Sequence, residues 1–287
     1  TNGYFESPQK FSRLNGIVKY HGSFNRNNTV TAILTGFTSK WYASGQIPDR
    51  AVESGLVGFY GAIDNTEGGK TSRHNASIEL QTKLNNGGTL RNLFYYSRYK
   101  FELYSNFTFF KEDPINGDQI RQKESRNIIG YQGSYQKEIY IGKLKTEAKA
   151  GIQVRYDVID NIELTRTKDR TINTAAIMLG NVNEMNAGAY YSQKISFSKK
   201  LDVTGGLRAD YFNNHYDNKL TSQTLSANSI MLSPKLDFNY PVPSAQMKDL
   251  AQIKINDKVY PFTVVTNTAS TEVVLEINNI QPSDYKK

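Results

Sequence analysis

The stretch Arg73-His-Asn-Ala-Ser-Ile-Glu-Leu-Gln-Thr-Lys-Leu84 decides the fold class, because apolar and polar side chains alternate along it. Ala76, Ile78 and Leu80 fall on one face of an extended chain, and the residues between them are polar. A repeat of two residues is typical of a β-strand whose two faces meet different surroundings. The stretch therefore predicts a long strand with one apolar and one polar face.

The same alternation recurs at residues 147–157 and 201–211. We predict nine strands, at residues 10–22, 29–42, 71–84, 89–105, 125–138, 144–158, 184–197, 201–213 and 228–240. They exceed the ~5–6 residues usual in globular sheets and suit a tilted strand that crosses a bilayer, which needs ~9–11. Six apolar residues should share the convex face of one curved sheet: Ile78, Leu80, Ile152, Val154, Leu207 and Ala209.

The predicted connections alternate in length. Short turns are expected at residues 25–28, 85–88, 139–143 and 198–200, and long polar loops at 43–70, 106–124, 159–183 and 214–227. Long loops at one end of the strands and tight turns at the other are typical of outer-membrane barrels. The fold class that we predict is all-β, a long antiparallel meander forming part of a transmembrane β-barrel.

Composition excludes several classes of function. The 287 residues contain no cysteine, so disulfides and thiolate metal sites are impossible. The net charge of +8 is spread along strands without a basic run, which argues against nucleic acid as a partner. His21, His74 and His215 lack metal-ligand spacing, and no nucleophile or phosphate-loop motif is present, so we expect no enzyme, no metal and no cofactor. Asp113 and Asp118 suggest either calcium or, more simply, a solvated loop tip.

The pattern changes after Tyr240. Pro241-Val-Pro-Ser-Ala reads as a linker or turn, and three shorter strands follow, with a hairpin turn at Asn256-Asp257. We therefore divide the chain into a partial outer-membrane barrel at residues 1–240 and a linker with a small, immunoglobulin-like β segment at 241–287.

Four segments carry a resemblance to a known family. They are Trp41-Tyr-Ala-Ser-Gly-Gln-Ile-Pro-Asp-Arg-Ala-Val, Gly58-Phe-Tyr-Gly-Ala-Ile-Asp-Asn-Thr-Glu-Gly-Gly-Lys-Thr-Ser-Arg, Gly205-Gly-Leu-Arg-Ala-Asp-Tyr-Phe and Ser233-Pro-Lys-Leu-Asp-Phe-Asn-Tyr. Together they resemble the barrel of TonB-dependent outer-membrane receptors, over about residues 1–240. The resemblance implies active uptake of a scarce nutrient, such as an iron chelate, cobalamin or a glycan, across the bacterial outer membrane.

The resemblance also implies partners. They are outer-membrane lipid, a plug domain and a periplasmic energy transducer in the full-length parent, and a small-molecule substrate that the sequence leaves unidentified. The plug and the remaining strands of a barrel of about 22 are expected outside this sequence. Nine strands alone should form an open half-pipe that neither closes nor transports.

Two groups of charged residues are candidate site residues. In the first long loop, Arg50 or Arg73 could pair with a carboxylate to hold the loop, or the group could contact substrate. This candidate ligand-binding set is Asp49, Arg50, Glu53, Asp64, Glu67 and Arg73. The second group should point inward and line a lumen, where it would anchor a plug or form internal pairs. This lumen-lining set is Glu79, Arg98, Lys100, Arg155, Arg208 and Asp210.

Two alternatives to the transporter remain at this stage. The chain could be a surface or soluble ligand-binding module that acts through its long loops, or a truncated or fused product with no transport of its own. A continuous apolar band on one face would favour the transporter over the soluble binder.

Overall fold

The computed structural model describes residues 3–7, 9–198 and 201–239, and beyond them the backbone of four short strands. Contacts divide the chain into two units, Thr1–Ile195 with Thr204–Asp237, and Ser196–Val203 with Phe238–Lys287.

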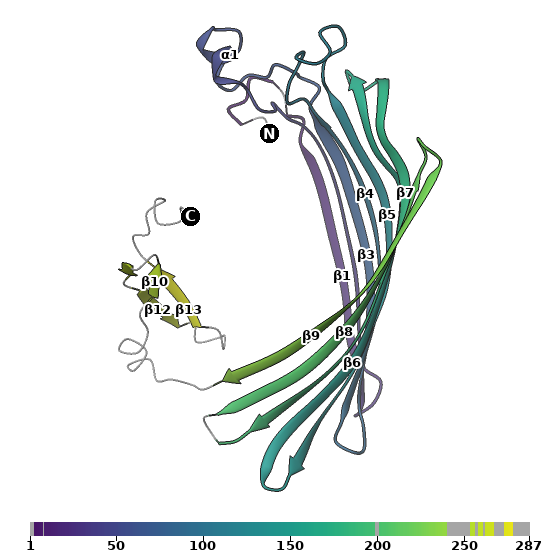
Figure 1. The fold of residues 1–287 in the computed structure, drawn as a ribbon, viewed down its shortest axis with the longest axis vertical. Coiled ribbons are helices and arrows are strands. Elements are labelled where there is room, and N and C mark those ends of the chain that lie inside the picture. Colours follow the sequence, from purple (N-terminus) through teal and green to yellow (C-terminus); the bar gives the residue numbers. More distant parts are fainter. Residues whose placement is uncertain are drawn as a thin grey trace. The chain divides into compact units, whose positions relative to one another are not determined.

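Nine strands form one antiparallel sheet in chain order, which confirms the predicted all-β meander (Figure 1). The strands are β1 (Ser12–Ser23), β2 (Asn28–Tyr42), β3 (Gly68–Lys83), β4 (Thr89–Ser105), β5 (Ile120–Ile141), β6 (Leu144–Lys168), β7 (Ile172–Ser196), β8 (Asp202–Asn218) and β9 (Gln223–Asn239). β1 and β9 each have one neighbour in the sheet, so the sheet is open, as expected for part of a barrel.

Two of the four predicted long loops are wrong. β6 continues to Lys168 and β7 begins at Ile172, and only residues 219–222 separate β8 from β9. The strands extend because backbone pairing continues there, for example between Ile120 and Arg166. Apolar and polar residues do not alternate regularly in these extensions, as in Ala175-Ala-Ile-Met-Leu of β7, so the pattern that reveals a strand in the sequence disappears. The loops after β2 and β4 are long, as predicted, and the first carries the short helix α1 (Asp49–Glu53).

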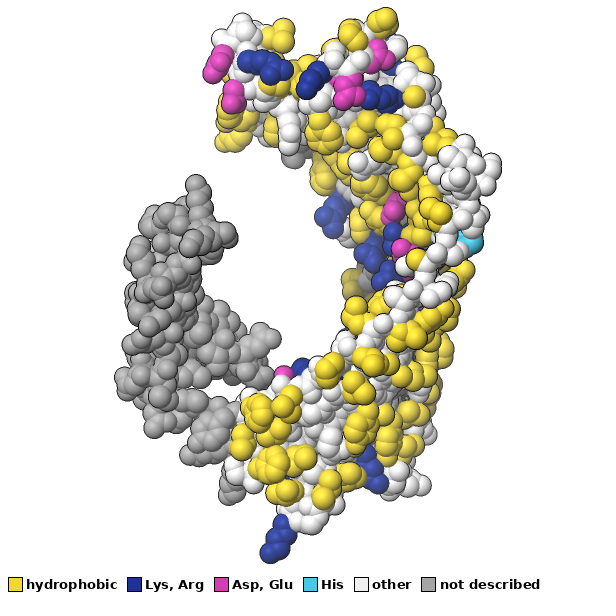
Figure 2. All heavy atoms as spheres, in the orientation of Figure 1, with side chains coloured by type: hydrophobic (Ala, Val, Ile, Leu, Met, Phe, Trp, Pro, Cys, Tyr) yellow, Lys and Arg dark blue, Asp and Glu magenta, His cyan; other side chains and the backbone are white. Residues whose placement is uncertain are grey.

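Strand register assigns the residues to two faces of the sheet. Ile78 lies opposite Phe94, Phe94 opposite Tyr131 and Tyr131 opposite Val154, so these four share a face. We call this face the convex face. The alternate residues, such as Tyr95 and Arg155, form the concave face, because successive side chains point to opposite sides of a sheet. In Figure 2, Lys, Arg, Asp and Glu side chains gather in the hollow of this sheet.

The six apolar residues predicted to share the convex face do so. Register places Leu80 and Ile152 beside the four residues above. Arg208 Nη2 donates to Gln153 Oε1 at 3.0 Å, which puts Arg208 on the concave face with Gln153. Its neighbours Leu207 and Ala209 therefore point to the convex face.

The sheet lacks a globular core. Among the described residues, the buried apolar side chains are Val30, Ala51, Tyr104, Ile128 and Ile159. Large convex-face side chains are instead exposed, with Ile129 60% and Ile152 51% accessible. A contiguous exposed apolar surface marks an interaction with lipid or protein. In the part of the chain that the structure describes, no helix is both long and apolar enough to span a bilayer.

In the second unit, β10 (Ile253–Ile255) pairs with β11 (Lys258–Tyr260), and β12 (Phe262–Thr266) pairs with β13 (Val273–Ile277). Both pairs are antiparallel. The predicted linker at 241–245 and the predicted turn at Asn256-Asp257 lie outside the described residues. The division at residue 240 and the immunoglobulin-like character of the tail stay predictions.

Candidate functional site

The concave face carries a charged cluster across β5 and β6. Arg155 donates from Nε to Asp157 Oδ1 (2.7 Å) and from Nη2 to Asp157 Oδ2 (2.6 Å). Arg126 on β5 reaches the same carboxylate through Nη1 at 3.2 Å, and Glu184 lies 3.8 Å from that nitrogen. Asp157 is 1% exposed. Its charge is tolerated because two guanidinium groups satisfy both oxygens.

A second pair lies on β8. Arg208 donates from Nη2 (2.6 Å) and Nε (2.9 Å) to Asp210 Oδ1, and Nε is also 2.7 Å from Oδ2. The pair lies over Gly188, where an added Cβ would come within 2.5 Å of Asp210 Oδ1 and 2.7 Å of Arg208 Nη2. Glycine at this position therefore lets the ion pair lie flat on the wall of the sheet.

A chain of hydrogen bonds crosses β2, β3 and β4 on the same face. Arg73 Nε donates to Ser97 Oγ (3.3 Å), Ser97 Oγ donates to Asn75 Oδ1 (2.7 Å), and Asn75 Nδ2 donates to Thr35 Oγ1 (2.8 Å). Within the described residues, Arg73 forms no ion pair. Its terminal guanidinium nitrogens remain available to a ligand or to a neighbouring domain.

Above the sheet, a half-buried carboxylate joins the two long loops. Asp64 Oδ2 accepts from Asn106 Nδ2 and from Gln119 Nε2, each at 2.9 Å. Asp64 Oδ1 accepts from the backbone N–H of Thr66 (2.8 Å) and from its hydroxyl (2.5 Å). Burial raises the pKa of Asp64, but the hydrogen bonds from Thr66, Asn106 and Gln119 outweigh it, so the pKa lies below its usual 3.8. We call Asp64, Thr66, Asn106, Gln119 and Arg170 the loop clasp.

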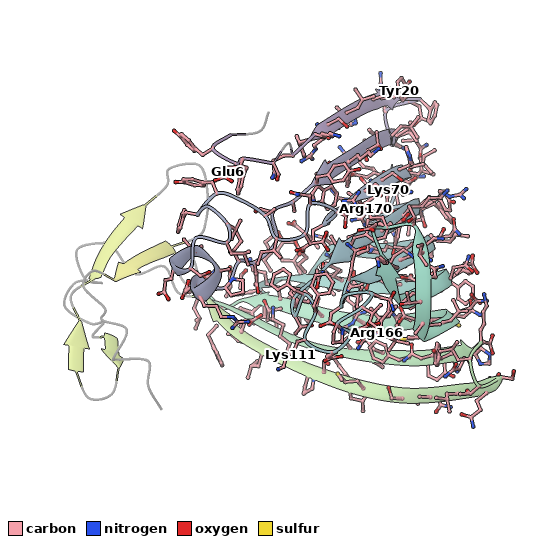
Figure 3. All side chains as sticks on the ribbon, turned by 90° about the horizontal axis from the view of Figure 1, so that it is seen from above. Glu6, Tyr20, Lys70, Lys111, Arg166 and Arg170 are labelled. Atoms are coloured by element: carbon pink, nitrogen blue, oxygen red, sulfur yellow. The ribbon has the colours of Figure 1, made fainter. Side chains whose placement is uncertain are left out.

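Arg170 brings the β6–β7 turn into the loop clasp. Its Nη2 donates to the Glu67 carbonyl (2.7 Å) and its Nε donates to the Thr66 carbonyl. The guanidinium lies 4.0 Å from the ring centroid of Tyr42 and 5.0 Å from that of Tyr104. Arg170 is labelled among these loops in the view from above (Figure 3). One cation thus fixes the loop before β3 to two aromatic side chains.

Glu67 is a buried carboxyl that pairs with no cation in the part of the chain that the structure describes. Its Oε1 has no hydrogen-bond partner among the described residues, and the residue is 5% exposed. Burial, opposed by the Asn106 backbone N–H and reinforced by the charge of Asp64, raises the pKa of Glu67 from 4.5 to about 7. The carboxylate fits against Gly45, where a Cβ would come within 2.0 Å of Oε1. Glu67 therefore gains or loses its proton near neutral pH, and the charge buried in the loop before β3 changes with it.

The loop between β4 and β5 is held by its own aspartates. Asp118 accepts backbone N–H groups of Glu112 (3.0 Å) and Asp113 (2.8 Å), and it is 5% exposed. Asp113 accepts the N–H of Ile115 (3.0 Å) and of Asn116 (2.9 Å). The interpretation of Asp118 as a solvated tip is therefore wrong, because it is a buried acceptor that closes the loop. Nothing in these contacts requires a cation.

The first loop also borders an open cavity of about 540 Å³. Asp49 and Glu53 line it together with Phe5, Phe59 and Tyr60. The Tyr60 ring lies 5.1 Å from Phe59 and 6.3 Å from Phe5, both edge to face. Carboxylates beside exposed aromatic rings can bind a ligand that has both polar and apolar parts.

The structure separates the candidate ligand-binding residues into three places. Asp49 and Glu53 border the cavity, with Arg50 beside them on α1. Asp64 and Glu67 lie at the loop clasp. Arg73 lies on the concave face of β3. Among the described residues, neither Arg50 nor Arg73 forms the predicted salt bridge that would hold the loop.

The lumen-lining set needs one correction. Glu79, Arg155, Arg208 and Asp210 lie on the concave face, but Arg98 and Lys100 lie on the convex face, in phase with Phe94 and Tyr96. Both faces of β4 carry aromatic residues, so the sequence alone does not fix the phase of the strand. Pairing with β3 does, because His74 lies opposite Arg98 and Ser72 opposite Lys100.

Sequence reasoning missed most of the loop clasp. Asn106 and Gln119 are uncharged residues in loops, and Arg170 lies in a stretch taken for a long loop. Thr66, Asn106 and Gln119 each lie near the end of a predicted strand, which was the one available signal. Residues so far apart in the sequence form no motif, so their contact could not be predicted. No group of three or more His, Asp or Glu within the described residues is arranged to hold a metal ion.

The comparisons with known proteins agree with this geometry. The model of the TonB dependent receptor-like β-barrel family matches residues 5–247, so the chain belongs to this family. The family consists of transporters and receptors of the Gram-negative outer membrane. No curated protein sequence matches the chain.

Solved structures share the fold at low identity. The unliganded ferric citrate transporter FecA is 12% identical, with a TM-score of 0.71 over 82% of this chain and 34% of that one. The siderophore receptor PiuA from Acinetobacter baumannii is 14% identical, with a TM-score of 0.66 over 83% and 41%. The copper transporter OprC is 9% identical, with a TM-score of 0.55 over 83% and 36%. The chain thus spans less than half of each of these proteins.

Proposed function

We propose that this chain forms part of the outer-membrane wall of a receptor that takes up a scarce nutrient. The observation that carries the proposal is the chemistry of a single-layer sheet, which exposes apolar side chains on its convex face and paired charges on its concave face. A sheet of this kind suits lipid on one side and a wet lumen on the other. In this arrangement Glu79, Arg155, Arg208 and Asp210 line the lumen.

The orientation follows from the connections. The ends of the strands that carry the loop clasp would face the outside of the cell, and the tight turns after β1, β3 and β5 would face the periplasm. Along β6 the convex-face residues are apolar from Ala148 to Val158. At about 3.3 Å per residue and a tilt of ~45°, this run spans roughly 25 Å, the height of the apolar band of such barrels.

The substrate that we propose is an anionic iron chelate, in preference to cobalamin or a glycan. FecA and PiuA are named for ferric citrate and siderophores, and OprC for copper, so fold alone leaves the choice open. The concave face adds a physical reason, because the terminal guanidinium nitrogens of Arg73 have no partner among the described residues and lie below the loops. Guanidinium groups bind carboxylates through paired hydrogen bonds. Asp49 and Glu53 at the cavity would contact the ligand earlier, through its hydroxyl or amide groups.

The partners of this proposal are a plug domain inside the barrel and a periplasmic energy transducer that acts on it. The paired charges of the concave face would hydrogen-bond the plug, since ion pairs on a wet wall still present free acceptors and donors. A second function, ligand binding without transport by this chain, is favoured by the loop cavity.

Uptake assays test the proposal. Gram-negative cells that lack their own receptors would express the full-length protein that contains this chain, and radioactive ferric chelates would be supplied under iron limitation. We expect accumulation that requires the energised membrane, and a reduction of about tenfold or more with Arg73→Gln, which removes an interaction to a charged group. Gln132→Asn, a neutral change on the same face, is the control. Binding without accumulation would favour the ligand-binding module, and neither binding nor uptake of any chelate would refute the substrate class.

A further inference from the structure

The convex face has a sharp chemical boundary at the same register on three strands. Toward the loop end, the apolar run ends at Ala76 on β3, Tyr96 on β4 and Ile129 on β5, and each lies opposite the next, whereas on β6 it continues through Tyr156 to Val158. One step further, the row contains His74, Arg98 and Asn127. A boundary that crosses strands distant in sequence marks a change of solvent along the face.

Cations dominate the convex face beyond this boundary. The next rows place Lys100 between Ser72 and Ser125, with Asp160 opposite Ser125 on β6, and then Lys70 and Lys123 on either side of Glu102. Lys40 lies directly opposite Lys70. Like charges in directly opposed positions destabilise a sheet unless an anion lies near them. We call Lys70, Arg98, Lys100 and Lys123 the basic patch.

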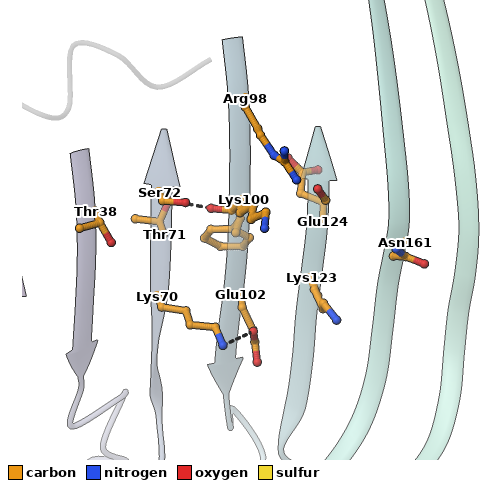
Figure 4. A pocket seen from close by; sticks show the side chains of 12 residues that line it. Thr38, Lys70, Thr71, Ser72, Arg98, Lys100, Glu102, Lys123, Glu124 and Asn161 are labelled. Carbon is orange, nitrogen blue, oxygen red and sulfur yellow. Dashed lines mark hydrogen bonds and ion pairs between the residues drawn. The ribbon is translucent and has the colours of Figure 1, made fainter. Parts of the chain in front are cut away.

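The acidic residues of the protein neutralise this patch incompletely. Lys70 Nζ lies 2.9 Å from Glu102 Oε2, and its side chain is still 64% exposed. Among the described residues, no carboxylate lies within 4.0 Å of Arg98 or Lys100. The four cations line a hollow of about 500 Å³ together with Thr38, Ser72 and Ser125, and only two acidic residues, Glu102 and Glu124, line it among the described residues (Figure 4). This combination of exposed cations and hydroxyl donors can hold an oxyanion.

We propose that the basic patch binds the phosphate headgroup of an anionic bilayer lipid whose acyl chains lie against the apolar rows below it. This inference rests on the proposed placement of the sheet in a membrane. Arg98 and Lys100 stand two and four residues beyond Tyr96. For strands tilted by ~45°, that is roughly 5–10 Å above the apolar edge, which is the depth of the headgroup layer.

The position of the patch selects a lipid over a soluble anion. A soluble anion would gain from the cations alone, whereas a lipid also covers the exposed side chains of Phe94 and Ile129, which are 55% and 60% accessible. Arg98 and Lys100 can also bury their aliphatic stems along that apolar surface and keep their charges at the headgroups. The patch faces away from the concave face, so it has no direct access to a transported substrate.

The test uses the full-length protein in nanodiscs of phosphatidylcholine that contain a minor fraction of phosphatidic acid. Native mass spectrometry would count the phosphatidic acid molecules that stay bound, with diacylglycerol as the dephosphorylated probe and inorganic phosphate as the soluble probe. We expect selective retention of phosphatidic acid. Arg98→Gln combined with Lys100→Gln should weaken it roughly 25-fold, because each cation near the surface contributes about a fivefold factor.

The matched control is Lys19→Gln combined with Lys83→Gln, which removes two lysines from the concave face and should leave lipid retention unchanged. Arg98→Lys keeps the charge and should retain most of the binding. Equal retention of phosphatidic acid and diacylglycerol by the unaltered protein would overturn the proposal even if the double variant failed to fold. Displacement of the lipid by millimolar inorganic phosphate would overturn it in favour of a soluble anion. Normal iron uptake with no lipid preference would refute the basic patch alone, whereas failure to enter the bilayer would refute the membrane placement as well.

Discussion

The two faces of one sheet meet their surroundings in opposite ways. On the convex face, side chains such as Val154 and Ile129 are apolar and exposed, and no described element of the chain covers them. On the concave face, charged groups such as Asp157 and Arg155 are adjacent and satisfy one another. Both faces are built by the same strands, so the difference lies in which alternate residues are apolar. The contrast shows that this sheet is stabilised by two different environments rather than by a shared core.

The largest effect should follow from a charge on the convex face. Val154→Lys places an ammonium in the middle of the apolar rows, where a lysine facing lipid costs about 2–4 kcal/mol. We expect a loss of membrane assembly, measured as the fraction of heat-modifiable protein on unheated gels. Gln132→Lys on the concave face of the neighbouring strand is the control and should assemble normally. Equal assembly of the two variants would contradict the assignment of the faces.

A smaller loss should follow from breaking a concave-face pair. Asp157→Asn keeps the shape but leaves Arg126 and Arg155 without their shared counter-charge, and we expect about 1–3 kcal/mol of destabilisation. Both arginines keep some solvent contact, which limits the cost. Urea unfolding in detergent measures it. If the Asp157→Asn variant were as stable as the unaltered protein, the contacts of Asp157 with the two arginines would not stabilise the sheet.

The loop end sharpens the comparison, because Asp157 is paired with two guanidinium groups, whereas Glu67 is buried and no cation of the described residues pairs with it. A carboxyl whose pKa is raised from 4.5 to about 7 contributes stability that is complete below pH 4.5 and is lost as the pH rises through about 7. Glu67→Gln should therefore stabilise the loop above pH 7, by at least about 1 kcal/mol, since one unit of pKa corresponds to about 1.4 kcal/mol.

Amide hydrogen exchange in residues 43–67 at pH 5 and pH 8 would measure this effect. The unaltered protein should protect these amides better at pH 5, after correction for intrinsic exchange, and Glu67→Gln should remove the difference. Asp64→Asn is the contrasting variant, because its hydrogen bonds favour the charged form and their loss should reduce protection at both values. A pH response that survives in Glu67→Gln would show that another group titrates.

The smallest effect should come from an exposed pair at the opposite end of the strands. Lys145 Nζ lies 2.8 Å from Glu138 Oε1, and the two side chains are 52% and 56% exposed. Lys145→Gln should leave stability nearly unchanged, because water screens such pairs. Unfolding in urea at low and high salt checks this. A large loss of stability would mean that an exposed ion pair at this end of the strands stabilises the sheet as much as the more buried pairs do.

The sequence by itself determined the strands and most of their faces. Alternation at residues 73–84 and 147–157 predicts long amphipathic strands. A repeat of two residues separates apolar from polar side chains only in an extended chain, where alternate residues point to opposite faces. The structure has nine strands in the predicted order. The prediction failed where alternation fades, at the extensions of β6 to β9, and on β4, where aromatic residues occupy both faces and register with β3 decides the phase.

The tertiary structure alone decided the loop clasp and the basic patch. Asp64, Asn106 and Gln119 come together because two loops fold over the same strand ends, and hydrogen bonds between residues about 40 to 55 positions apart leave no local pattern. Lys70, Arg98 and Lys123 form one surface because three strands pair in one register. A sequence records which side of a strand a residue occupies, whereas its neighbours on that side depend on pairing between strands.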